Sequence, residues 1–218
     1  HVTCGPPVEA IEPVRYLSNH SSGKMGYAIG AELAARGAEV ILISGPTSLH
    51  APAGVARINV TSAAEMHEVA LAAFDGCPDT PKADGAVICA AVADYTPAKP
   101  SAGKIKKSDS EMNIPLVQTK DIAAELGSIK GSRLLVGFAL ETENGEQNAL
   151  SKLERKNIDF IVLNSLQDAG AGFGTDTNKF TVIGRDCSMM AHPLASKSDV
   201  AGLIADRIED FFAVRPEK

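Results

Sequence analysis

A loop of small polar residues, glycines and one lysine lies near the start of the chain, and its composition suits a bound phosphate. It runs Ser18-Asn19-His20-Ser21-Ser22-Gly23-Lys24-Met25-Gly26. Apolar residues then recur at the spacing of one helix face, at Met25, Ile29 and Leu33, so the loop is expected at a helix N-terminus. Free backbone N–H groups and the helix dipole favour an anion there, and the lysine adds a full charge. The sequence therefore predicts phosphate binding by Ser22, Gly23, Lys24, Met25 and Gly26.

The two widespread phosphate-binding motifs do not describe this loop. A Walker A loop requires a first glycine and a serine or threonine after the lysine, where this chain has Ser18 and Met25. The Rossmann fingerprint requires a different glycine spacing and an acidic residue after the second strand, which here ends in Ser44-Gly45-Pro46. A tight turn whose glycines serve packing alone is the alternative. Asn19 favours ligand binding, because its amide offers both a donor and an acceptor.

A second candidate site is Ala90-Ala91-Val92-Ala93-Asp94-Tyr95, which follows a continuous apolar run. Ligands of open α/β sheets bind outside the carboxyl ends of the strands. Small side chains at such a position let a ligand approach the backbone, and Asp94 can accept hydrogen bonds from a ribose or a base. The structural alternative is an alanine-rich strand end followed by a capping aspartate.

Lysines form two further candidate sites. Lys104, Lys106 and Lys107 lie on a long loop, and flexible lysines over a crevice suit phosphoryl or acyl-phosphate transfer, where negative charge develops. Lys152 and Lys156 are one helical turn apart, so they project from the same helix face. For both groups, solvated surface lysines are the alternative interpretation.

Strand-like and helix-like segments alternate along the chain, which is typical of an α/β domain with a mostly parallel sheet. Expected strands lie at residues 2–4, 39–44, 56–60, 85–91, 134–139, 160–163 and 180–183, and expected helices at 24–36, 63–74, 147–156 and 196–212. Ser62 and Glu65 form a capping box at the start of the second helix. The last strand is expected in a hairpin with a turn near Asp176-Thr177-Asn178.

One long irregular stretch, at about residues 94–113, contains prolines, a glycine and most of the local lysines. An irregular loop of that length inside a domain is usually functional or disordered, so we expect a mobile active-site loop that is not ordered without ligand. Residues 1–218 are expected to form one Rossmann-like domain of three layers, with a small β extension.

The composition is that of an ordinary globular protein, with 44% apolar and 22% charged residues. A net charge of −6 argues against general binding to nucleic acid or to an anionic membrane, and no signal peptide or membrane-spanning run is visible. Cys4, Cys77, Cys89 and Cys187 lack zinc-ligand spacing and are expected to be reduced thiols of a cytoplasmic protein. The first residue, His1, is not a start methionine, which we interpret as a segment cut from a longer protein.

Together these segments resemble the phosphopantothenoylcysteine synthetase family, the ligase step of coenzyme A biosynthesis. The resemblance covers essentially the whole chain and rests on ordered motifs at Pro13–Gly26, Ala90–Tyr95, Lys104–Lys107, Glu154–Asn157 and Gly172–Asp176. It implies that the carboxylate of 4′-phosphopantothenate attacks CTP to form an acyl-cytidylate and pyrophosphate. The amine of L-cysteine then displaces CMP. CTP and Mg²⁺ are the implied co-substrate and metal, and no residue is assigned as a metal ligand.

The resemblance also implies roles for individual residues. Asn19 and Arg15 match positions needed to convert the acyl intermediate with cysteine, and Lys104 matches a mobile-loop lysine needed to form it. The implied nucleotide-binding positions are Ala90, Ala91, Asp94, Lys104, Lys120, Asp121, Ile122, Ala123, Phe138, Lys152 and Lys156. Lys120 departs from the family, which often has proline there.

The resemblance further implies a homodimer, whose sites can draw residues from the partner, and fusion to or association with a flavin-dependent phosphopantothenoylcysteine decarboxylase. Two other functions stay open at this point. One is an NAD(P)-dependent oxidoreductase with a Rossmann fold, which the missing acidic residue disfavours. The other is a non-catalytic nucleotide-binding module, which would leave Asn19 and Lys104 without a role.

Overall fold

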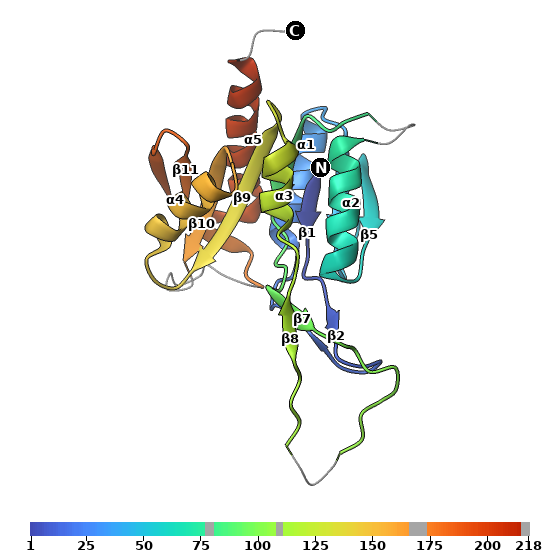
Figure 1. Cartoon of the computed structure of the whole chain (residues 1–218). Coiled ribbons are helices and arrows are strands. Elements are labelled where there is room, and N and C mark those ends of the chain that lie inside the picture. Colours follow the sequence, from blue (N-terminus) through green and yellow to red (C-terminus); the bar gives the residue numbers. More distant parts are fainter. Residues whose placement is uncertain (77–80, 108–110, 166–173, 215–218) are drawn as a thin grey trace.

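An eight-stranded sheet with helices on both faces forms the body of the molecule (Figure 1). The computed structural model describes residues 1–76, 81–107, 111–165 and 174–214. The strand order is β12-β11-β10-β9-β6-β1-β4-β5. Six of the strands run parallel, and they are β5 (Val55–Asn59), β4 (Val40–Ser44), β1 (Val2–Cys4), β6 (Gly85–Ile88), β9 (Leu134–Glu141) and β10 (Phe160–Ser165). This arrangement confirms the predicted Rossmann-like α/β class.

The chain changes direction across the sheet between β1 and β6. It runs outward from β1 to β4 and β5, and then returns to add β6, β9 and β10 on the other side. The loops after two neighbouring strands therefore diverge at this point, and open α/β sheets bind ligands in the crevice so formed. The predicted phosphate loop follows β1, and the predicted strand end Ala90–Tyr95 follows β6.

Alternating residues of each strand face two separate cores. On β4, Leu42 packs with α1 (Lys24–Ala35) and α5 (Lys197–Ala213), whereas the next residue, Ile43, packs with the helices of the opposite face. Those helices are α2 (Ala63–Asp75), α3 (Ile122–Ile129) and α4 (Gly145–Arg155). This alternation is the side-chain period of a strand buried on both faces, and it explains why these strands appear as continuous apolar runs.

Helix bounds agree with the predicted ones to within two residues, except for α3, which was not predicted. Asp121 caps α3 by accepting a hydrogen bond from the backbone N–H of Ala124 at 3.0 Å. The predicted capping box of α2 is present in part: Ser62 accepts from the N–H of Glu65 at 3.2 Å, but the Glu65 carboxylate accepts from the N–H of Thr61, at 2.7 Å, and not from that of Ser62. None of the described helices is long and apolar enough to cross a membrane.

The predicted turn near residues 176–178 is wrong. Thr177 already pairs with Ser196, as part of the antiparallel hairpin of β11 (Thr177–Gly184) and β12 (Met189–Ser196). The turn of that hairpin follows Gly184, whose backbone N–H donates to the carbonyl of Ser188 at 2.9 Å. Turn-forming residue types occur at both places, and the long ladder between the strands selects the second one.

An arm projects from the carboxyl edge of the sheet (Figure 1). It consists of two short ribbons, β2 (Glu9–Ala10) with β3 (Tyr16–Leu17) and β7 (Tyr95–Pro97) with β8 (Leu116–Gln118). Part of the predicted irregular stretch is therefore a strand, and residues 108–110 within it lie outside the described residues. The predicted β extension is the β11–β12 hairpin, whereas the arm was not predicted.

Candidate functional site

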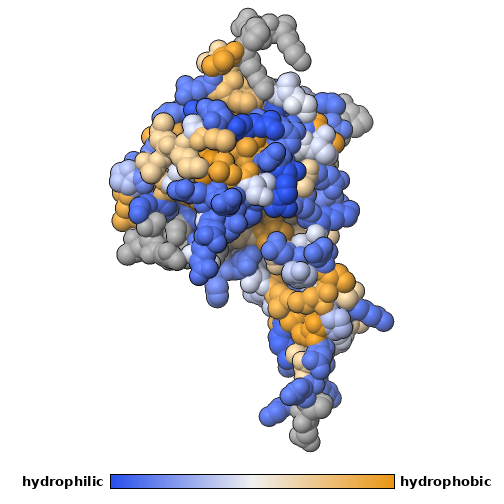
Figure 2. All heavy atoms as spheres, turned by 60° about the vertical axis from the view of Figure 1, so that its left-hand side comes forward, coloured by the Kyte–Doolittle hydropathy of each residue, from blue (hydrophilic) through white to orange (hydrophobic). Residues whose placement is uncertain are grey.

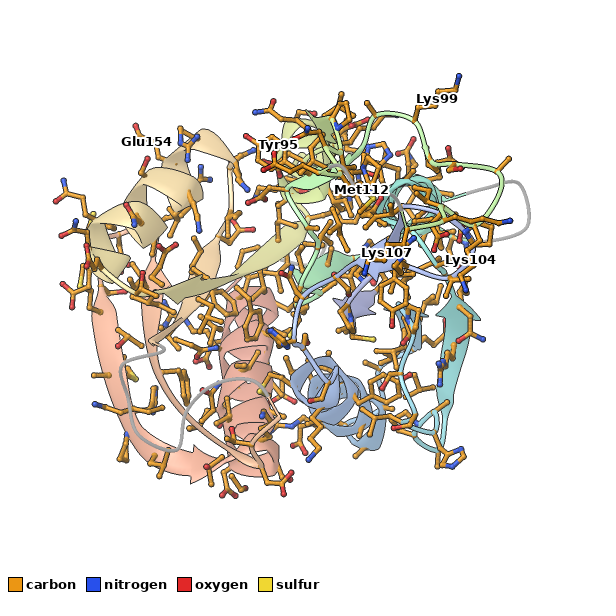
Figure 3. The ribbon with its side chains drawn as sticks, turned by 90° about the horizontal axis from the view of Figure 1, so that it is seen from below. Tyr95, Lys99, Lys104, Lys107, Met112 and Glu154 are labelled. Carbon is orange, nitrogen blue, oxygen red and sulfur yellow. The ribbon has the colours of Figure 1, made fainter. Side chains whose placement is uncertain are left out.

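Two cavities at the carboxyl edge of the sheet, one on each face, contain predicted site residues, and Figure 3 looks onto this edge. We call them the α1 cavity, of about 400 Å³, and the α4 cavity, of about 680 Å³. Their common wall is formed by Ala90 and Val92, which follow β6, and by Phe138 of β9. The predicted strand-end site therefore stands between two cavities and lines both.

The α1 cavity contains most of the predicted phosphate loop. Its lining includes Ser22, Gly23, Lys24 and Met25 at the start of α1. Gly26 is not part of the lining. It lets the helix approach β1, because a Cβ there would lie 2.4 Å from the Cβ of Cys4.

The N-terminus of α1 is open to an anion. Gly23 precedes the helix with a φ of 80°, a left-handed conformation that glycine adopts without steric cost. No side chain caps the first turn, and α1 is the helix among those described whose first turn holds no acidic residue. Its leading N–H groups and dipole therefore face the cavity without a built-in counter-charge on the helix.

Two lysines bring positive charge to the α1 cavity, and both contact residues 174–176. The Nζ of Lys24 lies 2.6 Å from an oxygen of Asp176, and it also donates to the carbonyl of Gly174 at 3.4 Å. The Nζ of Lys197, at the start of α5, donates to the carbonyl of Thr175. Burial and the neighbouring Lys24 charge together hold the pKa of Lys197 below its usual range. The hydrogen bond from Lys24 lowers the pKa of Asp176.

Asn19 lies at the same cavity and reaches across to the β6 side. Its Nδ2 donates to the carbonyl of Ala91 at 2.9 Å, and the N–H of Ala91 donates to the carbonyl of Gly5 at 3.2 Å. This chain of contacts joins the loops that follow β1 and β6. Asn19 is exposed and lines the cavity, so its amide can contact a ligand there.

The α4 cavity brings together most of the predicted nucleotide positions, whereas Ala91 lines the α1 cavity alone. The lining of the α4 cavity includes Ala90, Asp94, Lys120, Asp121, Ile122, Ala123, Phe138, Lys152 and Lys156. The two lysines of α4 are held by carboxylates, since Lys152 pairs with Glu141 at 2.6 Å and Lys156 with Asp121 at 2.9 Å. Burial raises the pKa of Glu141, but hydrogen bonds from Lys152 and Asn148 outweigh it, so the net shift is downward.

Two predicted catalytic residues lie on the arm and line neither cavity. Arg15 donates to the carbonyl of Ile105 at 2.8 Å and to the carboxylate of Glu12 at 3.1 Å. Glu12 also accepts from the N–H of Ile105 at 2.7 Å, so both backbone groups of that residue are held. Lys104 is exposed and precedes Ile105 in the chain. In Figure 3 it lies on the same side as Lys107 and well away from Glu154 of α4. The roles of Arg15 and Lys104 stay predictions.

Sequence reasoning missed several residues that line the cavities. Lys197 and Asn178 belong to the α1 cavity, and Arg155 belongs to the α4 cavity. The first two come from the C-terminal hairpin and helix, which are far away in sequence and carry no local motif. The one available signal was the segment Gly172–Asp176, whose last three residues the structure places against both lysines of the α1 cavity.

The thiol and carboxylate groups near the site limit its chemistry. Cys89 lines the α1 cavity, and burial raises the pKa of its thiol, so it is not an activated nucleophile. Among the described residues, no group of three or more histidine, cysteine, aspartate or glutamate side chains is placed to hold a metal ion. The described part of the site therefore offers anion binding through lysines and backbone N–H groups.

Comparison with known proteins identifies the family of the chain and several similar proteins. Residues 1–212 match the DFP family, described as the DNA/pantothenate metabolism flavoprotein C-terminal domain. A cysteine/cysteine sulfinic acid decarboxylase of an unknown prokaryotic organism is 49% identical over 95% of this chain and 56% of its own length. The coenzyme A biosynthesis bifunctional protein CoaBC of Bacillus subtilis is 46% identical over 95% of this chain and 50% of its own. The chain thus spans about half the length of these relatives.

Solved structures confirm the fold. The C-terminal domain of a coenzyme A biosynthesis bifunctional protein CoaBC superposes with a TM-score of 0.82 at 38% identity, covering 98% of this chain and 95% of that one. A Cab2 variant in complex with phosphopantothenate-cysteine has a TM-score of 0.72 at 15% identity, covering 97% and 86%. The second likeness shows a shared fold alone.

These findings contradict the predicted ligase. The matched family is described as a flavoprotein domain, and one similar relative is named as a decarboxylase. The predictions of phosphopantothenate–cysteine ligase activity, of CTP and of Mg²⁺ are corrected accordingly, and the oxidoreductase alternative gains no support. The physical reason is that the motifs do not specify a reaction. A helix N-terminus, a strand end with small side chains and a set of lysines suit many phosphorylated ligands.

Proposed function

Because the chain belongs to the DFP family, we propose that its α1 cavity binds the phosphate end of a phosphorylated pantothenate–cysteine compound in coenzyme A biosynthesis. The observation that carries this proposal is the uncapped N-terminus of α1, which opens into a cavity with two lysines at the switch point of the sheet. Helix dipole, free N–H groups and ammonium groups together favour a phosphate monoester there.

The rest of such a ligand has room along the shared wall. Asn19 offers an amide to the peptide-like groups of a pantothenoyl chain, and Ala91 and Val92 present small or apolar surface beside it. The lysines of the α4 cavity lie beyond that wall and suit a second anionic group, such as the phosphate of a nucleotide. This arrangement supports the predicted nucleotide-binding positions as ligand contacts without fixing a reaction.

The family description also implies a flavin, and the described residues fit only part of FMN. Its phosphate suits the start of α1 for the reasons given above. Phe138 is the one aromatic side chain among the described residues of the α1 lining, and it packs against the core of α1 and α5. The described lining therefore builds a phosphate site but no slot for the three-ring system.

Isothermal titration of the chain with phosphopantothenoylcysteine, FMN and inorganic phosphate, each separately, tests the proposal. We expect binding of phosphopantothenoylcysteine, competed by inorganic phosphate. Replacing Lys24 with Met removes a charged hydrogen-bond donor, so the affinity should fall about tenfold or more. Lys82→Met is the matched control, because Lys82 pairs with Asp75 in a part of α2 that lines neither cavity. If FMN binds and phosphopantothenoylcysteine does not, the α1 cavity would be assigned to the phosphate of the cofactor instead.

Decarboxylation is the reaction to assay next, since one similar relative carries that name. Release of CO₂ from phosphopantothenoylcysteine by this chain with added FMN would place the reaction in this half of the longer proteins. Binding without CO₂ release would limit the contribution of this half to holding the substrate. The bifunctional names and the half-length match support a natural fusion to, or association with, a second catalytic part.

We also propose that two copies associate through the arm. Several large side chains of the arm are exposed, namely Val14, Tyr16, Tyr95, Met112, Leu116 and Val117. Figure 2 shows hydrophobic residues gathered on the arm below the body. An exposed apolar patch of this kind marks a protein interface, and a second copy supplies the same surface in return. Sedimentation equilibrium should give a dimer for the wild type and a monomer for Val117→Asp. A monomeric wild type would overturn this proposal.

A further inference from the structure

We propose that the carboxylate of Asp176 is an internal stand-in for the ligand phosphate, which a bound phosphate displaces from Lys24. This inference rests on the proposed function, because it concerns the regulation of the same anion site. The contact is short, at 2.6 Å between the Lys24 Nζ and an Asp176 oxygen. It places a negative charge on the lysine of the first turn of α1, a turn that carries no acidic residue of its own.

The backbone of residues 174–176 is held independently of that carboxylate. The backbone N–H of Lys197 donates to the carbonyl of Asp176 at 2.9 Å, and the Lys197 side chain donates to the carbonyl of Thr175. Rotation of the Asp176 side chain alone therefore breaks its ion pair with Lys24, while the segment stays in place and Lys24 keeps only its longer contact with the Gly174 carbonyl. No rearrangement of the chain is needed for the exchange.

The Asp176 carboxylate is easily displaced because it is solvated. Its side chain is 86% exposed, and that of Lys24 is 36% exposed. Ion pairs with so much exposure contribute little, since water screens them and both side chains lose freedom. A phosphate monoester at the same place brings more charge and more acceptor atoms, and it also contacts the helix N–H groups that Asp176 leaves open.

The pair has a consequence for selectivity. With Asp176 in place, one of the two lysine charges of the cavity is neutralised before a ligand arrives. A ligand with a single negative charge gains little by replacing a carboxylate with another monoanion. A dianionic phosphate gains one further charge interaction, so the exchange favours phosphate monoesters over carboxylates of similar shape.

Titration of Asp176→Asn with phosphopantothenoylcysteine and with inorganic phosphate at fixed ionic strength tests the inference. The substitution removes the competing charge, so both affinities should rise about two- to fivefold. Asp206→Asn is the matched control, because Asp206 is an exposed acid paired with Arg36 on the α5 side and lines neither cavity. The gain should disappear when Lys24→Met is combined with Asp176→Asn.

The outcomes separate this inference from the function on which it rests. Unchanged or weaker binding in Asp176→Asn, with normal binding in the wild type, would overturn the inference alone. Absence of binding in both proteins would overturn the proposed function together with it. Equal gains in Asp176→Asn and Asp206→Asn would show a general charge effect and would also overturn the inference.

Discussion

The α1 cavity and the α4 cavity both present lysines to the carboxyl edge of the sheet, but they hold those lysines differently. In the α1 cavity, the partner of Lys24 is an aspartate that is 86% exposed. In the α4 cavity, the partner of Lys152 is Glu141, which is 16% exposed and accepts a further hydrogen bond from Asn148. The first counter-ion is easily exchanged and the second is structural. A count of positive charges would have treated the two sites as alike.

Removal of a buried lysine from the helices around the α4 cavity should lower the free energy of unfolding more than removal of an exposed lysine. At the C-terminal end of α3, Lys130 makes two hydrogen bonds of 2.6 Å to Asp159, and their side chains are 3% and 11% exposed. Lys130→Met leaves a buried carboxylate without its cation, so the free energy of unfolding should fall by about 3–5 kcal/mol. Urea denaturation measures the change. Lys24→Met, at the exposed pair of the α1 cavity, should cost less than about 1 kcal/mol. Equal losses in the two variants would contradict the comparison.

A glycine contact joins α3 to the residue that follows α4, Lys156, which lines the same cavity. A Cβ on Gly127 would lie 1.9 Å from the carbonyl oxygen of Lys156, which is backbone and cannot move aside. Gly127→Ala should therefore lower the free energy of unfolding by about 1–3 kcal/mol and weaken anion binding at the α4 lysines. Gly103→Ala is the control, since nothing lies within 4 Å of its added Cβ. A stable Gly127→Ala variant would show that the two helices are free to separate.

The smallest effect concerns pH. The pKa of Glu141 in the folded protein lies below its ordinary value. The ionised carboxylate therefore stabilises the fold at a pH above the ordinary pKa, and this stabilisation is lost as the pH falls through the lowered pKa. Glu141→Gln removes this contribution. Its unfolding free energy should be lower by about 1 kcal/mol at neutral pH and should converge with the wild-type value in acid. Denaturation at pH 7 and at about pH 3 compares the two proteins. A constant difference across that range would contradict the assigned pairing.

The body of the fold could be predicted because its strands are buried on both faces. Runs such as Leu134–Ala139 and Phe160–Leu163 are continuously apolar, and their positions were found to within two residues at each end. The arm escaped prediction because its strands have two or three residues each, too few for any periodicity. Helix α3 escaped because it has eight residues and contains Gly127, which weakens the helical pattern.

The residues of the candidate site likewise fall into some that the sequence predicts and some that it does not. The start of α1 was found because a helix N-terminus has local signals in glycine, serine and the following apolar spacing. Lys197 and Asp176 were not placed in the site, because only the folding of the C-terminal hairpin against α1 brings them there. The reaction was predicted wrongly, since residue types that suit a phosphate do not state what happens to the molecule that carries it.

The wall shared by the two cavities has a thermodynamic consequence. Ala90, Val92 and Phe138 belong to both linings, so a ligand that shifts any of them alters the neighbouring cavity as well. Whatever factor one occupant imposes on the affinity of the other must then apply equally in reverse. The shared wall thereby links the two binding equilibria. The affinity of a ligand for one cavity is defined only when the occupancy of the other cavity is stated.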